Sequence, residues 1–168
     1  MNKKTVKVIF VLIFFLASMV CFAADPAEGF WLSVDEKTGQ VTAGWQIYVQ
    51  GGKLYGRILS AADATPADKA TDCKASYSGY PVAGNVSQMP IIGSIWIFGL
   101  TQDGKEGQWK GGNVIDPSDG KMYGCRITFH AAGGKFSVDT LEMRGTIGPL
   151  GRSQFWRKAT EAQARGVR

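Results

Sequence analysis

The stretch from Thr42 to Ser60, TAGWQIYVQGGKLYGRILS, contains two strand-like segments and the turn that joins them. Its first half alternates large apolar with polar side chains, as a strand with one buried face does. Gly51-Gly52 follows, and glycine tolerates the positive φ that a two-residue hairpin turn requires. The second half then returns as another strand. The segment therefore predicts an antiparallel β-hairpin.

Similar short segments, separated by turn residues, continue along the chain. Glycine accounts for 22 of the 168 residues and charged residues for only 20%, which suits an all-β domain with many tight turns. We expect strands at residues 28–34, 42–50, 53–60, 93–102, 108–115, 121–130, 135–147 and 151–157. About eight short strands at hairpin spacing are typical of a β-barrel or a β-sandwich.

Three segments depart from this pattern. Residues 61–92 form a connection rich in Ala, Asp, Gly, Ser and Pro, and a connection of this length is usually functional or mobile. The strand after it, GSIWIFGLTQ at 93–102, is nearly continuous in apolar residues, which indicates that both of its faces are covered. Residues 159–168 are mostly polar, and we expect a flexible C-terminal tail there.

The N-terminus has the pattern of a secretory signal peptide. A basic start precedes the apolar run VIFVLIFFLASMV at 8–20, which is short for a membrane span of about 20 residues. Cleavage after Ala23 would remove residues 1–23 and leave a single domain at 24–158. An uncleaved membrane anchor is the alternative. The sequence thus predicts an exported protein, periplasmic or secreted, with no membrane span after cleavage.

The predicted mature chain is close to electrically neutral. The formal net charge is +5, but three of the 19 Lys and Arg residues lie in the predicted signal peptide. The remainder carries 16 basic against 14 acidic residues, a net charge of +2. The basic isoelectric point is therefore no argument for nucleic-acid binding, and we expect no nucleic-acid partner.

Two cysteines, Cys73 and Cys125, remain in the predicted mature chain. In an exported protein such a pair favours a disulfide bond. A metal-binding pair and a reactive thiol are the alternatives, but two cysteines with one distant histidine make a poor metal site.

The sequence lacks the motifs of common catalytic and cofactor sites. Its single histidine, His130, lies at the end of an expected strand. G-x-S-x-G, the P-loop, G-x-G-x-x-G before a helix and H-E-x-x-H are all missing. We therefore expect a protein without enzymatic activity, cofactor or metal.

Aromatic residues and arginines supply the candidate ligand contacts. The five tryptophans lie on separate expected strands: Trp31, Trp45, Trp96, Trp109 and Trp156. In a barrel they either fill the core or line one ligand cavity. Four arginines also lie within strands: Arg57, Arg126, Arg144 and Arg157. One that faces inward would hold a carboxylate head group, because a guanidinium binds carboxylate through two parallel hydrogen bonds.

The two ends of the domain resemble the calycin pattern of lipocalins and fatty-acid-binding proteins. Glu28-Gly29-Phe30-Trp31 opens the first strand, and Trp156-Arg157 closes the last. In that pattern an N-terminal tryptophan packs at the closed end of the barrel beneath an arginine of the last strand. The resemblance implies structural roles at the barrel end for Trp31, Trp156 and Arg157.

Further motifs resemble those of a bacterial exported family known as domain of unknown function 2147. They are GGKLYGRI at 51–58, PIIG at 90–93, WKGGNVIDP at 109–117, GKMY at 120–123, LEMRG at 141–145 and GRSQFWR at 151–157. The resemblance covers about residues 28–158. It implies a lipocalin-like, antiparallel up-and-down barrel with a long loop between strands 3 and 4, and no established activity. Many relatives carry Cys where this chain has Tyr55, so their disulfide pattern does not transfer.

Within this framework we expect ligand contacts from Arg144, Tyr123, Trp109 and Trp45. The first hypothesis is an exported protein that holds an apolar or amphipathic, lipid-like small molecule in its barrel, with residues 61–92 as a lid. The second is an envelope protein-interaction module with a solid barrel and an unknown protein partner. An enzyme with an unrecognised site is the third. The volume of the barrel interior separates the first two hypotheses.

Overall fold

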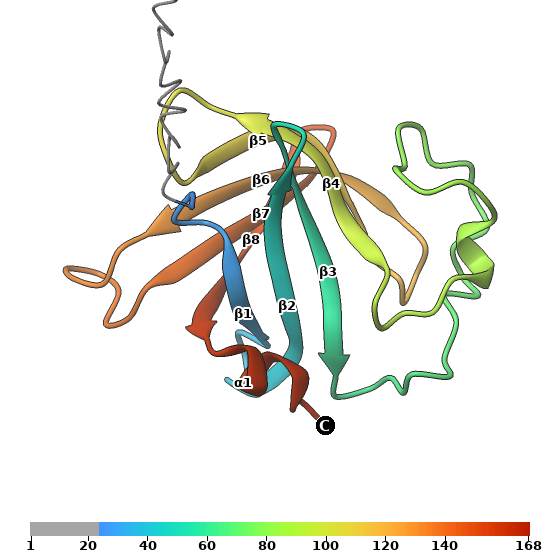
Figure 1. Cartoon of the computed structure of the whole chain (residues 1–168), viewed down its shortest axis with the longest axis horizontal. Coiled ribbons are helices and arrows are strands. Elements are labelled where there is room, and N and C mark those ends of the chain that lie inside the picture. The colour runs from blue at the N-terminus through green and yellow to red at the C-terminus, as the bar shows by residue number, and fades with distance from the viewer. Residues whose placement is uncertain (1–23) are drawn as a thin grey trace, which may run out of the picture.

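Each strand pairs antiparallel with the next, and the last pairs back to the first. The computed structural model describes residues 24–168, so the predicted signal peptide lies outside the described residues. The strands are β1 (Gly29–Val34), β2 (Val41–Gln50), β3 (Lys53–Ala61), β4 (Ile95–Gln102), β5 (Gln108–Ile115), β6 (Met122–His130), β7 (Thr140–Ile147) and β8 (Leu150–Ala159). They form a closed barrel in sequence order (Figure 1). The predicted all-β up-and-down barrel is therefore confirmed.

Glycine turns set the strand boundaries. Gly51 and Gly52 have φ of 58° and 73° between β2 and β3, as the predicted hairpin turn requires. The seventh strand starts later than expected, at Thr140. Gly133 and Gly134 also have positive φ, and the Phe136 amide donates back to the Gly133 carbonyl at 3.2 Å. This turn uses residues that were predicted to extend the strand.

The long loop predicted between strands 3 and 4 is present at residues 62–94 and covers the outer wall of β4. Trp96 and Phe98 point outward, because Ile97 between them faces inward toward Ile47. Both outward side chains are nonetheless fully buried. Trp96 Nε1 donates to the Ile91 carbonyl at 2.8 Å, and the Tyr80 ring packs edge-on against Phe98. Both faces of β4 are thus covered, as its apolar sequence indicates.

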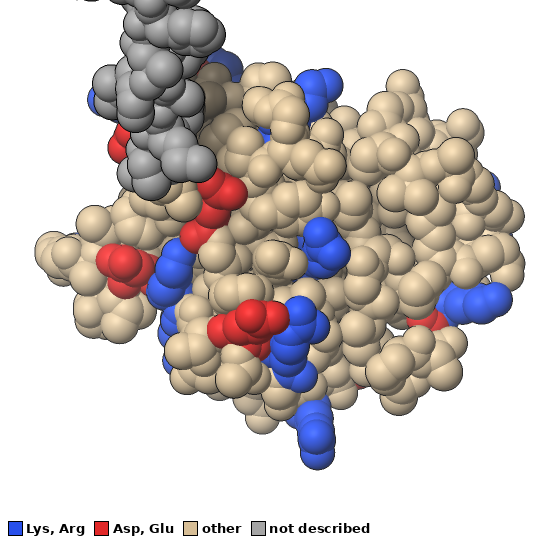
Figure 2. Space-filling view, in the orientation of Figure 1, with Lys and Arg blue, Asp and Glu red and all other residues tan. Residues whose placement is uncertain are grey.

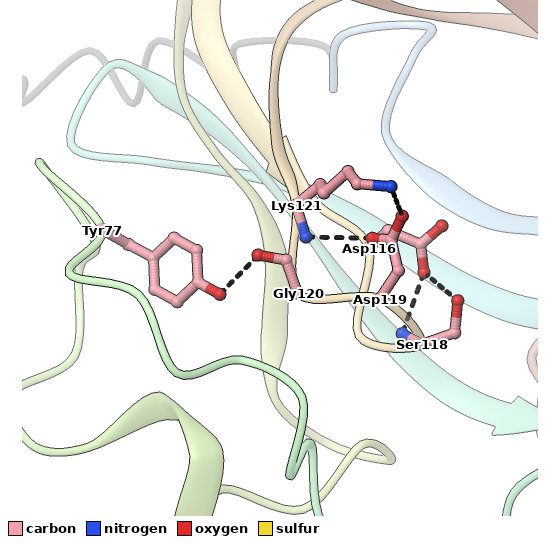
Figure 3. A network of polar contacts seen from close by, with 6 residues as sticks. All are labelled: Tyr77, Asp116, Ser118, Asp119, Gly120 and Lys121. Atoms are coloured by element: carbon pink, nitrogen blue, oxygen red, sulfur yellow. Dashed lines mark hydrogen bonds and ion pairs between the residues drawn. The ribbon is translucent and has the colours of Figure 1, made fainter.

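A second contact fixes this connection to the turn between β5 and β6. The Tyr77 hydroxyl donates to the Gly120 carbonyl at 2.6 Å (Figure 3). Burial raises the pKa of Tyr77 to about 12, so its hydroxyl keeps the proton that it donates. The turn is itself ordered by Asp116, whose carboxylate accepts hydrogen bonds from the Ser118 amide and hydroxyl. Residues 62–94 therefore lie beside the barrel and attach to it at both β4 and the β5–β6 turn (Figure 1).

Residues 25–28 close one end of the barrel. The Trp31 indole donates to the Ala27 carbonyl at 2.9 Å and packs edge-on against Phe129. Asp25 accepts hydrogen bonds from the Trp109 indole at 3.1 Å and from the Gly107 amide at 3.0 Å. These contacts join residues 25–28 to β1, β5 and the β4–β5 turn, while Trp31 extends the packing to β6.

The C-terminal residues, expected to be a flexible tail, form a short helix that packs on the barrel. Helix α1 (Glu161–Arg165) has a capping box between Thr160 and Gln163, and its Ala164 is fully buried. The Ser60 hydroxyl of β3 donates to the Ala164 carbonyl at 2.7 Å. The close approach depends on Gly44, because a Cβ there would overlap the Ala164 carbonyl. A single buried alanine among polar residues presents no apolar face in the sequence, so its pattern does not indicate a packed helix.

The predicted disulfide is absent, because Cys73 and Cys125 are both unpaired and buried. Cys73 lies beside Gly120 in the β5–β6 turn. Cys125 lies five residues farther along, within β6. With a rise of about 3.3 Å per strand residue, the two Cα atoms are separated by roughly 10 Å or more, beyond the ~7 Å limit for a disulfide.

We predict two free thiols in the folded protein. Burial raises the pKa of both Cys73 and Cys125, so little reactive thiolate forms in the folded state. Alkylation without reductant should be slow in the native protein and should modify both cysteines once urea unfolds it. Mass spectrometry after each treatment measures this. A chain that accepts no alkyl group until a reductant is added would contradict the unpaired arrangement.

Candidate functional site: a cavity at the open end of the barrel

The end of the barrel opposite residues 25–28 is hollow. It contains a cavity of about 980 Å³ that opens between the β1–β2 turn, the β3–β4 connection and the β5–β6 and β7–β8 turns. Its wall includes Trp45, Ile58, Val114, Tyr123, Met143, Gly145, Gln154 and Trp156, and its rim includes Asp35, Asp63, Asp72, Asp116, Lys69 and Arg152. The volume lies at the upper end of the roughly 300–1,000 Å³ range of small-molecule sites.

The size of the inward side chains explains why one half is filled and the other is hollow. Near the closed end the interior holds large, fully buried residues, among them Trp31, Leu54 and Leu141. Toward the open end small residues such as Ala43 and Gly145 take inward positions. An eight-stranded barrel has room either for its own side chains or for one small ligand, and this chain uses the two options in its two halves.

Two stacked indoles form part of the cavity wall. Trp45 of β2 and Trp156 of β8 have ring centroids 4.7 Å apart and planes inclined by 23°. Each indole nitrogen has a partner: Trp45 Nε1 donates to Ser33 Oγ at 3.2 Å, and Trp156 Nε1 donates to Gln154 Oε1 at 3.1 Å. Because their polar atoms are satisfied inside the wall, these side chains offer the cavity an apolar aromatic surface.

Ser33 holds the Trp45 side of this wall in place. Its hydroxyl lies 2.8 Å from the Thr42 hydroxyl and 3.2 Å from the Ala43 carbonyl, besides accepting the indole proton of Trp45. Ser33 itself is buried. The hydroxyl therefore ties β1 to β2 at the point where the cavity begins.

The structure divides the four predicted ligand contacts into two groups. Tyr123 and Trp45 line the cavity. Arg144 is on the outer face of β7, because Met143 and Gly145 on either side of it face the cavity, and it donates to Ser153 Oγ at 3.2 Å. Trp109 packs in the closed half, where Asp25 accepts its indole proton. The prediction that Arg144 contacts a ligand in the cavity is therefore wrong, and Trp109 packs against the closed end instead.

The predicted barrel-end residues also need revision. Trp31 packs at the closed end as expected, but the cation above its ring is Lys158, with Nζ 4.3 Å from the ring centroid. Arg157 points outward and donates to the Gly39 carbonyl at 3.1 Å. Trp156 lines the cavity instead of locking the barrel end. The adjacent residue, Lys158, occupies the position expected for Arg157 because alternate strand residues face inward.

His130 lies on the outer wall, away from the cavity. Its Nε2 atom is 3.0 Å from Glu142 Oε2, and Ser153 donates to the other Glu142 oxygen at 2.6 Å. Burial alone would raise the pKa of Glu142, but the hydrogen bonds from Ser153 and His130 outweigh it and hold this pKa below its usual value. These contacts link β6, β7 and β8 on the outside of the barrel.

Charges are dispersed over the surface. On the face shown in Figure 2, Lys and Arg lie scattered among Asp and Glu, and most of the surface is uncharged. Within residues 24–168, His, Cys, Asp and Glu form no group of three or more that is placed to hold a metal ion. The same residues include no helix with the length and hydrophobicity needed to cross a membrane.

Replacement of Ser33 by alanine should destabilise the cavity wall. The variant Ser33→Ala leaves the buried Trp45 indole proton without its acceptor, which we expect to cost about 1–3 kcal/mol of unfolding free energy. Urea unfolding measures the change. Ser78→Ala, at an exposed position in the β3–β4 connection, is the control and should stay within about 0.5 kcal/mol of wild type. Equal urea-unfolding midpoints for the two variants would show that Ser33 does not stabilise the wall.

Comparison with known proteins supports the fold and gives the family. Among solved structures, the chain matches protein HP1028 from the human pathogen Helicobacter pylori, described as belonging to the lipocalin family, with a TM-score of 0.60 and 18% identity over 82% of this chain and 85% of that one. At this identity the match shows a shared lipocalin-like fold. Comparison with curated proteins finds no match. The family model "Uncharacterized protein conserved in bacteria (DUF2147)" matches residues 29–158, and the chain therefore belongs to this family.

Proposed function

We propose that this protein is exported and holds an apolar or amphipathic small molecule in the open half of its barrel. The observation that carries the proposal is the cavity of about 980 Å³ with its aromatic wall. The lipocalin-like fold supports a binding role in general. The apolar N-terminal run at 8–20 supports export.

Apolar burial would supply most of the affinity. The wall offers Trp45, Ile58, Val114 and Met143 to a ligand, and each buried CH₂ group of an alkyl chain stabilises a complex by about 0.8 kcal/mol. One side of the opening is also apolar, because the β7–β8 hairpin exposes Leu150 to 71% at the rim. An apolar tail would therefore meet apolar surface from the rim to the cavity floor.

The β3–β4 connection forms one side of this opening. It contributes Ala64 and Ile91 to the lining and is anchored to the barrel through Tyr77 and Trp96. We propose that it shapes the entrance for the ligand, in place of the free lid that its length and composition indicated. The alternative of an interaction module with a solid barrel lacks support from this interior, since a solid barrel would have no room at Gly145.

A side chain that fills the cavity should abolish binding. A Cβ at Gly145 would lie 3.7 Å from Tyr123 Cβ and 4.0 Å from Val114 Cγ1, an ordinary contact distance, so Gly145→Phe can direct its ring into the cavity without a backbone clash. We expect it to weaken binding of the neutral dye N-phenyl-1-naphthylamine by at least about tenfold, a loss of about 1.4 kcal/mol. Dye fluorescence gives the affinity, and far-UV circular dichroism shows whether the barrel is intact.

Thr146→Phe is the matched control, because residue 146 is the next on β7 and faces outward. This variant should bind the dye as the wild type does. If folded Gly145→Phe binds the dye with wild-type affinity, or if the wild type binds no dye, the cavity is not the binding site that we propose.

A further inference from the structure

The opening of the cavity is acidic. Four carboxylates belong to its lining, and they come from three separate elements. Asp35 begins the β1–β2 turn, Asp63 and Asp72 lie in the β3–β4 connection, and Asp116 begins the β5–β6 turn. Because they are spread around an opening, they suit a broad organic head group more than one compact metal ion.

Two cations, Lys69 and Arg152, also belong to the lining, but both have partners of their own. Lys69 Nζ lies 3.4 Å from Gln88 Oε1 within the β3–β4 connection. Arg152 Nη2 lies 3.5 Å from Glu36 Oε2, a carboxylate beyond the lining. Arg152 is therefore paired with a carboxylate, Lys69 contacts only a neutral amide, and the four rim carboxylates outnumber the two cations.

The rim carboxylates, in contrast, have oxygens that are free to accept hydrogen bonds from a ligand. Asp35 uses Oδ1 for the hydrogen bonds from Lys37 and Thr38, and Asp116 uses Oδ1 for those from Ser118, so each has a second oxygen without a partner among the described residues. The hydrogen bonds from Thr38 hold the pKa of Asp35 below its usual value, which keeps this group ionised at neutral pH. The carboxylates of Asp63 and Asp72 accept no hydrogen bond from residues 24–168.

The surface beneath the rim is compatible with a cation and unfavourable for an anion. Trp45, Trp156 and Tyr123 contribute aromatic groups to the lining, and aromatic faces attract positive charge. The described residues that line the wall below the rim include no Lys or Arg, and Arg144, an expected ligand contact, is on the outer face. An anionic head group would thus lose water and meet four carboxylates, with Lys69 as the one rim cation that no carboxylate of the described residues pairs.

We infer that the cavity selects amphiphiles with a positively charged head group, such as an alkylammonium, over amphiphiles with a carboxylate. This inference rests on the proposed function, because it assigns a head-group charge to the ligand of the same cavity. It also depends on the cavity as much as on the acidic rim, since the cavity accommodates the tail while the rim contacts the head group.

Three probes with the same tail separate the head-group preference from cavity binding. Dodecyltrimethylammonium, dodecanol and dodecanoate share a twelve-carbon chain and carry a positive, neutral or negative head group. Isothermal titration calorimetry below their micelle concentrations should give the tightest binding for the ammonium, by about tenfold or more over dodecanoate. Raising the salt from about 50 mM to about 500 mM should narrow this ratio, because salt screens exposed charges.

A charge-removing variant tests whether the rim causes the preference. Asp63→Asn combined with Asp72→Asn should reduce the ratio between the ammonium and dodecanoate severalfold while dodecanol binds as before. Glu106→Gln removes a carboxylate from the exposed β4–β5 turn at the opposite end of the barrel and should leave the ratio unchanged.

Each outcome bears on one of the two claims. Equal affinities for the ammonium and dodecanoate, tighter binding of dodecanoate, or the same ratio in the double variant and in Glu106→Gln would overturn the inference. Dodecanol binding in any of these cases would leave the proposed function standing. Failure of all three probes to bind would overturn the inference and the proposed function together.

Discussion

The pairing of β1 with β8 is the constraint on which the rest of the structure depends. The two strands are at opposite ends of the domain in sequence and pair at Phe30–Ala159, Trp31–Lys158 and Leu32–Arg157. This pairing turns a meander of hairpins into a closed barrel and so creates an interior. Trp31 and Lys158 lie on the same face at this seam, with the ammonium over the indole ring, so the closing pair also helps to close one end of the barrel.

Closure leaves the interior to be divided by side-chain size. The half near residues 25–28 is filled by side chains, and Asp25 connects these residues to β5 by accepting a hydrogen bond from Trp109. The other half keeps its space because Ala43 and Gly145 face inward there, while Trp45 and Trp156 stack on one another along the wall. The cavity is therefore a consequence of particular residues at inward positions, and the same barrel with larger residues at those positions would be solid.

Much of the fold followed from the sequence because it depends on local signals. Glycine turns and short apolar segments marked all eight strands, and the continuous apolar run of β4 indicated that both faces are covered. The direction of individual side chains was harder to predict from the sequence, because irregular strand pairing near Ser33 and Gly44 changes which residues face inward. In β7 the alternation of Leu141, Met143 and Gly145 with polar residues does contain the signal that Arg144 faces outward.

Other features depend on contacts between distant residues and left no local pattern. Asp25 meets Trp109 across 84 positions of the chain, and Ser60 meets Ala164 across 104. In β8, Phe155 and Trp156 are adjacent aromatics, so alternation alone does not tell which one faces the cavity. The two cysteines likewise suit a disulfide by number and by the predicted compartment, and their positions in the barrel and its outer connection keep them apart.

Native mass spectrometry of the protein, recovered from an exporting host without detergent, shows directly whether the barrel carries a ligand. From the proposed function we expect a chain that starts near Ala24 and carries a discrete additional mass, which organic extraction removes and which proves to be an apolar or amphipathic small molecule. A bare polypeptide mass, both as isolated and after incubation with fatty acids, alkylammonium compounds and hydrophobic dyes, would contradict the proposed binding function.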